Sequence, residues 1–169
     1  MKKSLLATAI ALTAYLAGCN RVQAPVTLST PFPNADLAHY SASGSATIAG
    51  QAFMRQNGGG VVTCAGSLAL LMPDLPYFSE AVAHARSNQN VDFAADQQHA
   101  QSMVRKSTCD AQRNFVFTNL PVGGWIVTSR VHWVVADVSQ GGTLLQRGVQ
   151  SKAAQETKVL LTDSDLAGL

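Results

Sequence analysis

Three cysteines carry the most distinctive chemistry in this chain of 169 residues. Cys64 and Cys109 are far apart in the sequence, and neither has another cysteine or a histidine close to it. Zinc sites usually draw on short-range pairs such as Cys-X-X-Cys, so half of a metal site is the weaker interpretation. A pair of buried free thiols is the other alternative. We expect a disulfide between them, in an oxidising compartment.

The third cysteine, Cys19, follows a segment with the pattern of a secretory signal. Two lysines near the start make it positive, and no charge occurs from Leu5 to Leu16. This apolar run is too short to cross a bilayer, which needs about 20 residues. Because Ala17 and Gly18 come directly before Cys19, the segment resembles the lipobox of bacterial lipoproteins. The alternative is an ordinary secreted protein whose cysteine falls there by chance.

The lipobox resemblance implies that residues 1–18 are a signal peptide and that cleavage leaves Cys19 at the new N-terminus. The Cys19 thiol would receive a diacylglycerol and its amino group an acyl chain, which together exceed the two signals that stable anchoring needs. Asn20 stands where the enterobacterial signal for inner-membrane retention would have Asp, so the resemblance implies the outer membrane. We expect the protein to face the periplasm or the cell surface.

Charge and composition restrict both the partners and the domain organisation. The chain has 12 Lys and Arg against 10 Asp and Glu, and loss of two lysines with residues 1–18 leaves 10 of each. Nucleic-acid binding needs a concentrated basic face, which we do not expect here. Residues 19–43, rich in proline and small polar residues, predict a flexible tether. With 47% hydrophobic and 13% charged residues, the chain fits one domain, placed at 44–169.

Residues 44–169 carry mainly the signals of short β-strands. Apolar and β-branched runs at 47–54, 61–72, 143–150 and 157–162 are separated by glycine, asparagine and proline. From Pro76 to about Asn88, apolar residues recur at three-four spacing, which predicts a short helix, and the polar residues 88–101 predict a loop. About six or seven strands with one helical insertion predict a small, mainly β sandwich.

The stretch that begins at Trp125 alternates almost perfectly between two faces. Trp125 and Trp133 share one face with valines, which predicts that both tryptophans point into the core. Thr128, Arg130 and His132 lie on the other face, which is predicted to be solvated. These three residues form a possible binding face, because a rigid strand positions polar groups well.

A motif that leads into this strand resembles the carboxypeptidase regulatory-like domain, a small prealbumin-like (transthyretin-like) β-sandwich. That family runs from a Thr-Asp turn through a glycine into Phe-X-Phe, then Asn-Leu-Pro-X-Gly and an aromatic residue. The matching residues here are Thr108, Asp110, Phe115, Phe117, Asn119, Leu120, Pro121, Gly123 and Trp125. Asn114 stands where the family usually has glycine, and Trp125 follows an extra glycine where tyrosine is commoner. Asparagine tolerates the left-handed region, so we expect the turn to survive.

For function, this resemblance implies only a folding support, an adhesion module or a binding platform. The chain has no nucleophile elbow, zincin, Walker or Rossmann motif, and its four histidines are scattered. We therefore expect no enzymatic activity, metal or cofactor. The function expected is a non-catalytic envelope lipoprotein that acts as a structural or protein-interaction module. The alternative is a lipoprotein that binds an envelope glycan or small ligand, with Tyr77 as an exposed aromatic of the binding face.

Overall fold

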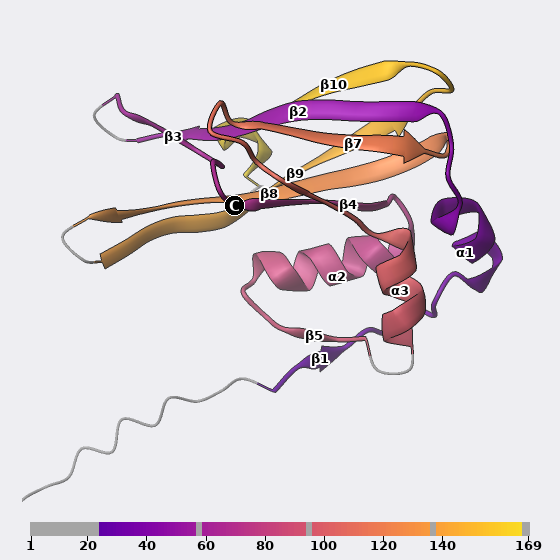
Figure 1. Ribbon diagram of the computed structural model, residues 1–169. Coiled ribbons are helices and arrows are strands. Elements are labelled where there is room, and N and C mark those ends of the chain that lie inside the picture. Colours follow the sequence, from indigo (N-terminus) through magenta and orange to yellow (C-terminus); the bar gives the residue numbers. More distant parts are fainter. Residues whose placement is uncertain (1–23, 57–58, 94–95, 136–137, 167–169) are drawn as a thin grey trace, which may run out of the picture.

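The computed structural model describes residues 24–56, 59–93, 96–135 and 138–166. Two four-stranded sheets face each other, and helices cover the outer side of one sheet (Figure 1). The elements are β1 Val26–Thr27, α1 Asn34–Ser41, β2 Ala46–Arg55, β3 Val61–Thr63, β4 Leu68–Pro73, α2 Pro76–Arg86, β5 Val91–Asp92, α3 Gln97–Met103, β6 Arg105–Thr108, β7 Asn114–Leu120, β8 Gly123–Val135, β9 Val138–Ser151 and β10 Glu156–Leu161. A short 3₁₀ turn, Asp163–Asp165, follows β10. The predicted class, a small and mainly β sandwich, is confirmed.

In the first sheet, β2 is the central strand. It pairs in parallel with β10, antiparallel with β7, and at its far end antiparallel with β3. Inward residues such as Ile48 and Ala52 are fully buried and alternate with half-buried neighbours. At Gly50 a side chain would collide with Phe115 of β7 and Val159 of β10, so this close approach of three strands requires glycine.

The second sheet has the order β6-β4-β8-β9, with every pair antiparallel. Trp125 of β8 is fully buried in the core, as predicted, and its indole nitrogen donates to the Ser151 hydroxyl at 3.0 Å. Trp133, near the other end of β8, is only partly buried. Of the two tryptophans predicted to point into the core, Trp125 is fully buried and Trp133 is only half-buried.

Helix α2 lies along the outer face of the second sheet (Figure 1). It begins at Pro76, whose fixed φ suits the first helical position. Phe78, Ala81 and Val82 bury its inner face, which confirms the predicted helix. The sheet is therefore covered on both sides, and the expectation that the second face of β8 is solvated is wrong at Thr128, which is 1% exposed.

The stretch predicted to be a loop, residues 88–101, contains part of a further helix. α3 buries only Ala100 and Met103, and the rest of its sequence is polar. β5, just before it, pairs in parallel with β1 through the partners Val26 and Val91. The helical layer therefore contains two helices and a two-stranded ribbon instead of one short helix.

The segment before the sandwich also packs onto the domain, so the tether predicted for residues 19–43 is corrected over 26–43. Tyr40 of α1 lies edge-on against Trp125, with ring centroids 5.0 Å apart. The Arg105 guanidinium donates to the carbonyl oxygens of Tyr40 and Ala42 at 2.8 and 3.2 Å, and to that of Ser102 at 2.6 Å. It thereby joins the C-terminal ends of α1 and α3, where carbonyl groups need partners. Residues 1–23, with the predicted signal peptide and Cys19, lie outside the described residues.

Glu80 on α2 holds the N-terminal segment by its carboxylate. The backbone amides of Ser29 and Thr30 donate to its two oxygens, each at 2.8 Å, and the Ser29 hydroxyl donates at 2.8 Å. Hydrogen bonds from Thr30 and Ser29, with the Thr30 hydroxyl foremost, lower the pKa of Glu80 to about 2. The charged form of Glu80 therefore accepts these hydrogen bonds. We call this contact of Glu80 with Ser29 and Thr30 the clasp.

The expected disulfide between Cys64 and Cys109 is present, with a Cα–Cα distance of 5.7 Å. Both cysteines are buried, at 0% and 2% exposure. Cys64 lies where the chain passes from β3 to β4, and Cys109 lies where it passes from β6 to β7. The bond therefore joins two of the places at which the chain passes from one sheet to the other.

The motif that resembles the carboxypeptidase regulatory-like domain forms the turn into β7. Asp110 accepts hydrogen bonds from the Asn114 backbone amide at 2.8 Å and from its side-chain amide. These bonds, the backbone one first, lower the pKa of Asp110. The left-handed residue of this turn is Arg113, with φ of 69°, so the expectation for Asn114 is corrected by one position. Asn119, with φ of 57°, takes the left-handed conformation before the next strand.

Replacing Cys64 and Cys109 together by alanine is expected to lower the free energy of unfolding by roughly 4 kcal/mol, because the unfolded chain regains the conformational entropy that the closed loop removes. Chemical denaturation of the oxidised wild type and of the double variant measures the difference. Reductant should lower the stability of the wild type and leave that of the variant unchanged. Equal stability of oxidised and reduced wild type would contradict a stabilising role.

Replacing Glu80 by Gln is expected to release the segment at Ser29 and Thr30, because a neutral amide accepts more weakly than a carboxylate. Amide hydrogen exchange at these two residues should accelerate in the variant. Glu156→Gln, on exposed β10, is the control and should leave both amides protected. In the wild type, the protection is fully present above the ordinary pKa of 4.5 and is lost as the pH falls through about 2. Protection that is unchanged in Glu80→Gln would contradict the clasp.

Candidate functional site

The four residues predicted to form a binding face lie in two separate places. Thr128, Arg130 and His132 follow one another along the outer face of β8, as their spacing predicts. Tyr77 lies in the first turn of α2 and does not line the same hollow. Three of the four predicted residues therefore lie together, and Tyr77 does not belong to the same surface.

Tyr77 is buried, at 3% exposure, so the expectation of an exposed aromatic is wrong. Its ring meets Phe32 edge-on at 5.2 Å and Phe78 edge-on at 5.4 Å, and Phe93 lies 6.2 Å away. Burial foremost, and then the charge of Asp96, raise the pKa of its phenol. This ring stabilises the contact between the N-terminal segment and the helical layer.

The three residues on β8 pass from buried to exposed along the strand. Thr128 is buried, Arg130 is half-buried, and His132 is exposed. Arg130 donates from Nη2 to the carbonyl oxygen of Ala85 at 2.9 Å, in the last turn of α2. A cation at a helix C-terminus interacts favourably with the helix dipole, so Arg130 fixes the end of α2. His132 lies farther along the strand from this contact.

A groove of about 370 Å³ opens beside these residues on the outer face of the second sheet. Its polar lining includes Thr128, Arg130 and His132, and its apolar lining is Leu68, Leu70 and Leu144. Leu68, at the start of β4, is 48% exposed. The groove thus combines aliphatic side chains with polar groups, all of them on paired strands of one sheet.

The leucines of the groove were not identified from the sequence. A signal for them exists, because residues 68–72 are apolar without alternation, as in a strand covered on both faces. Leu68 and Leu70 lie on one side of β4, and Ala69 and Leu71, both fully buried, lie on the core side. The sequence pattern of β4 thus indicates a strand with apolar contacts on both faces. The pattern of β8 was interpreted as that of a strand buried on one face only.

A second open surface lies on the outer face of the first sheet. It measures about 530 Å³ and includes Gln51, Asn114, Val116, Lys158 and Leu160. Gln51 donates to the side-chain oxygen of Asn114 at 2.8 Å, so these polar groups partly satisfy each other. Val116 and Leu160 are 48% and 44% exposed. The two sheets therefore each expose a leucine of similar accessibility, Leu68 on one and Leu160 on the other.

Within 24–56, 59–93, 96–135 and 138–166, no group of three or more His, Cys, Asp or Glu side chains could hold a metal ion. In the same residues, no helix has the length and apolarity needed to span a bilayer.

Neither protein-family models nor curated proteins match this sequence. Among solved structures, a candidate carbohydrate-binding protein from Pseudomonas aeruginosa is similar, with a TM-score of 0.63 and 21% identity. The match covers 79% of this chain and 98% of that protein. At this identity the likeness shows the fold alone, a mainly β sandwich.

Two pilins are similar at a lower level. The major pilin subunit of Bacillus cereus gives a TM-score of 0.42 at 12% identity, over 70% of this chain and 30% of the pilin. The minor pilin of Streptococcus agalactiae gives 0.37 at 9% identity, over 72% of this chain and 44% of the pilin. Similarity at this level does not bear on function.

Proposed function

We propose that this protein is a lipid-anchored, non-catalytic binding module of the bacterial cell envelope. Its binding surface is the groove beside Arg130 and His132, and its partner is an envelope protein. The observation that carries this proposal is the exposed Leu68 beside polar groups on a rigid sheet. Apolar residues bordered by polar ones are typical of protein interaction sites.

A protein partner fits this groove better than a sugar does. Bound sugars are commonly stacked on exposed aromatic rings, whereas the apolar lining here is aliphatic. Trp125 and Tyr77, two aromatics that could have formed a stacking platform, are 0% and 3% exposed. Leucine side chains with Arg130 and His132 beside them suit the apolar and polar side chains of a protein segment.

Glycan binding remains the second candidate function, favoured by the comparison with the Pseudomonas aeruginosa protein. That protein is a candidate carbohydrate binder and shares the fold over 98% of its length. A glycan could use the hydroxyl and cationic groups of the same groove. Recovery of a protein partner and titration with envelope oligosaccharides separate these two functions.

The proposed lipid anchor rests on the sequence of the residues that precede the described part of the chain. Leu16, Ala17, Gly18 and Cys19 match the lipobox pattern, and residue 24 is the first described residue. A diacylglycerol on Cys19 would keep the domain near the bilayer, since two acyl chains suffice for stable anchoring. The site of action is then the envelope, with the outer membrane as the proposed location.

Leu68→Asp is expected to reduce recovery of the partner by about tenfold or more, because a carboxylate buried in the interface replaces an apolar contact. The experiment is crosslinking in cells, purification from detergent-solubilised envelope and quantitative mass spectrometry. Leu160→Asp on the opposite sheet is a matched control, with 44% exposure against 48% for Leu68, and should retain the partner. Thermal unfolding of both variants checks folding. Loss with Leu160→Asp alone would place the interface on the first sheet, and loss with neither would refute the groove.

Cys19→Ser is expected to move the protein from the membrane fraction to the soluble fraction, because the acceptor for the diacylglycerol is removed. Fractionation of cell envelopes with immunoblotting measures this partition. The variant Cys64→Ala with Cys109→Ala is the control, and it should stay in the membrane fraction. A Cys19→Ser protein that remains membrane-bound would refute the lipid anchor.

A further inference from the structure

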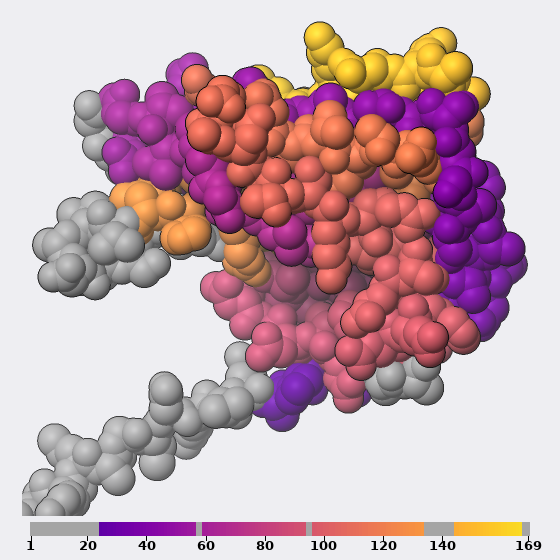
Figure 2. Space-filling view, viewed as in Figure 1, coloured from indigo at the N-terminus to yellow at the C-terminus, as the bar shows by residue number. Residues whose placement is uncertain are grey.

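A second hollow, separate from the groove, lies between the helical layer and the second sheet. It measures about 310 Å³ and is bounded by α2, α3, β4 and the start of β6. Figure 2 shows the surface hollowed between α2 and the strands above it. We call it the interlayer cleft. It shares Leu70 with the groove, whose other lining residues are different.

The interior of the interlayer cleft is apolar. Met72, Phe78, Phe93, Ala100 and Val104 line it. Phe78 and Ala100 are 1% and 4% exposed, so they form the buried floor of the cleft. The sequence explains why the space is not filled by the protein itself. Ala81 of α2 and Ala100 of α3 both line the cleft, and a side chain of one carbon leaves room where a leucine would fill it.

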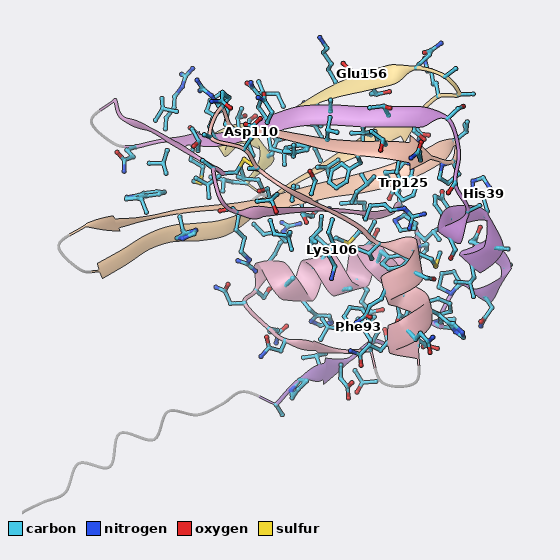
Figure 3. The ribbon with its side chains drawn as sticks, viewed as in Figure 1. His39, Phe93, Lys106, Asp110, Trp125 and Glu156 are labelled. Atoms are coloured by element: carbon cyan, nitrogen blue, oxygen red, sulfur yellow. A yellow bond between two sulfur atoms is a disulfide. The ribbon has the colours of Figure 1, made fainter. Side chains whose placement is uncertain are left out.

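The mouth of the cleft is polar and carries a positive charge. Gln97, Gln101 and Lys106 border it. Lys106 extends from β6 toward the helical layer (Figure 3). Among the described residues that line the cleft, Lys106 is charged and none is a carboxylate. The neighbouring cation, Arg105, is already bound to the carbonyl oxygens of Tyr40, Ala42 and Ser102.

We propose that the interlayer cleft binds a fatty acid, with the acyl chain between the helices and the carboxylate at Lys106. An apolar interior with few polar groups at the rim is the usual form of a small-ligand site, and its volume falls in the usual range. A sugar would place hydroxyl groups against Phe78 and Met72 without hydrogen-bond partners, which is costly. A cationic amphiphile would meet Lys106 with the wrong charge.

The volume of the cleft limits the length of the acyl chain. One water-sized unit takes about 30 Å³, so a cleft of about 310 Å³ has room for about ten non-hydrogen atoms. Octanoate has ten non-hydrogen atoms, and decanoate places ten carbons in the cleft when its two oxygens lie at Lys106, so these two acids fit best. Shorter acids leave part of the cleft empty, and longer ones extend beyond the mouth.

Isothermal titration of the purified mature protein with hexanoate, octanoate, decanoate and dodecanoate, each below its micellar concentration, tests the proposal. Each added methylene should tighten binding by about fourfold until the cleft is full, and further length should then add little. Decyltrimethylammonium should bind more weakly than decanoate. Absence of binding to the wild type, or affinity that does not depend on chain length, would overturn the proposal. Preference for the cationic amphiphile would overturn the role of Lys106.

Two variants examine the two ends of the cleft. Ala100→Leu should fill it and weaken decanoate by about tenfold or more, whereas Ala38→Leu on the exposed side of α1 should have no effect. Lys106→Gln should weaken decanoate by about twofold to fivefold and leave decanol unchanged, with Lys158→Gln as the control. Thermal unfolding shows whether the Ala100→Leu variant is folded. If that variant is unfolded, Lys106→Gln still tests the proposal, because Lys106 is exposed and its substitution does not disturb the core. Decanoate affinity unchanged in both variants would refute the site.

The fatty-acid site and the proposed protein interface can fail independently. Leu68→Asp changes the groove, and it should leave decanoate binding intact. Loss of the protein partner with intact decanoate binding would support both sites. Loss of decanoate binding in Leu68→Asp would show that the interlayer cleft is not the place where the acid binds.

Discussion

The disulfide between Cys64 and Cys109 sets the arrangement on which the other layers depend. It joins two of the points where the chain crosses from one sheet to the other. Backbone hydrogen bonds reinforce the same junction, because the Cys64 amide donates to Ala52 and the Cys109 amide to Ser67. Between the two cysteines lie β4, α2, β5, α3 and β6. Both helices of the helical layer, with the β4 side of the groove and all of the interlayer cleft, therefore belong to one covalently closed loop.

Much of this architecture could be predicted from the sequence, because the signals were local. The helix that begins at Pro76 shows three-four spacing, and the alternation from Trp125 identifies β8. The pairing of Cys64 with Cys109 followed from their chemistry. α3 was missed because it buries only Ala100 and Met103, which is too little for a periodic signal. α1 was missed for a related reason, since Tyr40 is its single buried residue.

The candidate site was predicted in part, and the missing part depended on contacts between distant segments. Alternation places Thr128, Arg130 and His132 on one face, but it does not tell whether another element covers that face. Tyr77 is buried by Phe32, which comes from a segment that was expected to be a tether. Leu68 of β4 and Leu144 of β9 line one groove, on the two sides of β8, only after the strands have paired. Such information resides in the packing of the helical layer and is absent from any single window of sequence.

The clasp at Glu80 decides how force would enter the domain if Cys19 is anchored as proposed. Tension from the bilayer reaches the described chain at residue 24 and passes first to the short pairing of β1 with β5. It then reaches the hydrogen bonds of Ser29 and Thr30 with Glu80, and so acts on α2 before any strand of the sandwich. Because α2 forms a wall of the interlayer cleft and is fixed at its end by Arg130, traction on the membrane attachment would strain this wall before the strands of the two sheets.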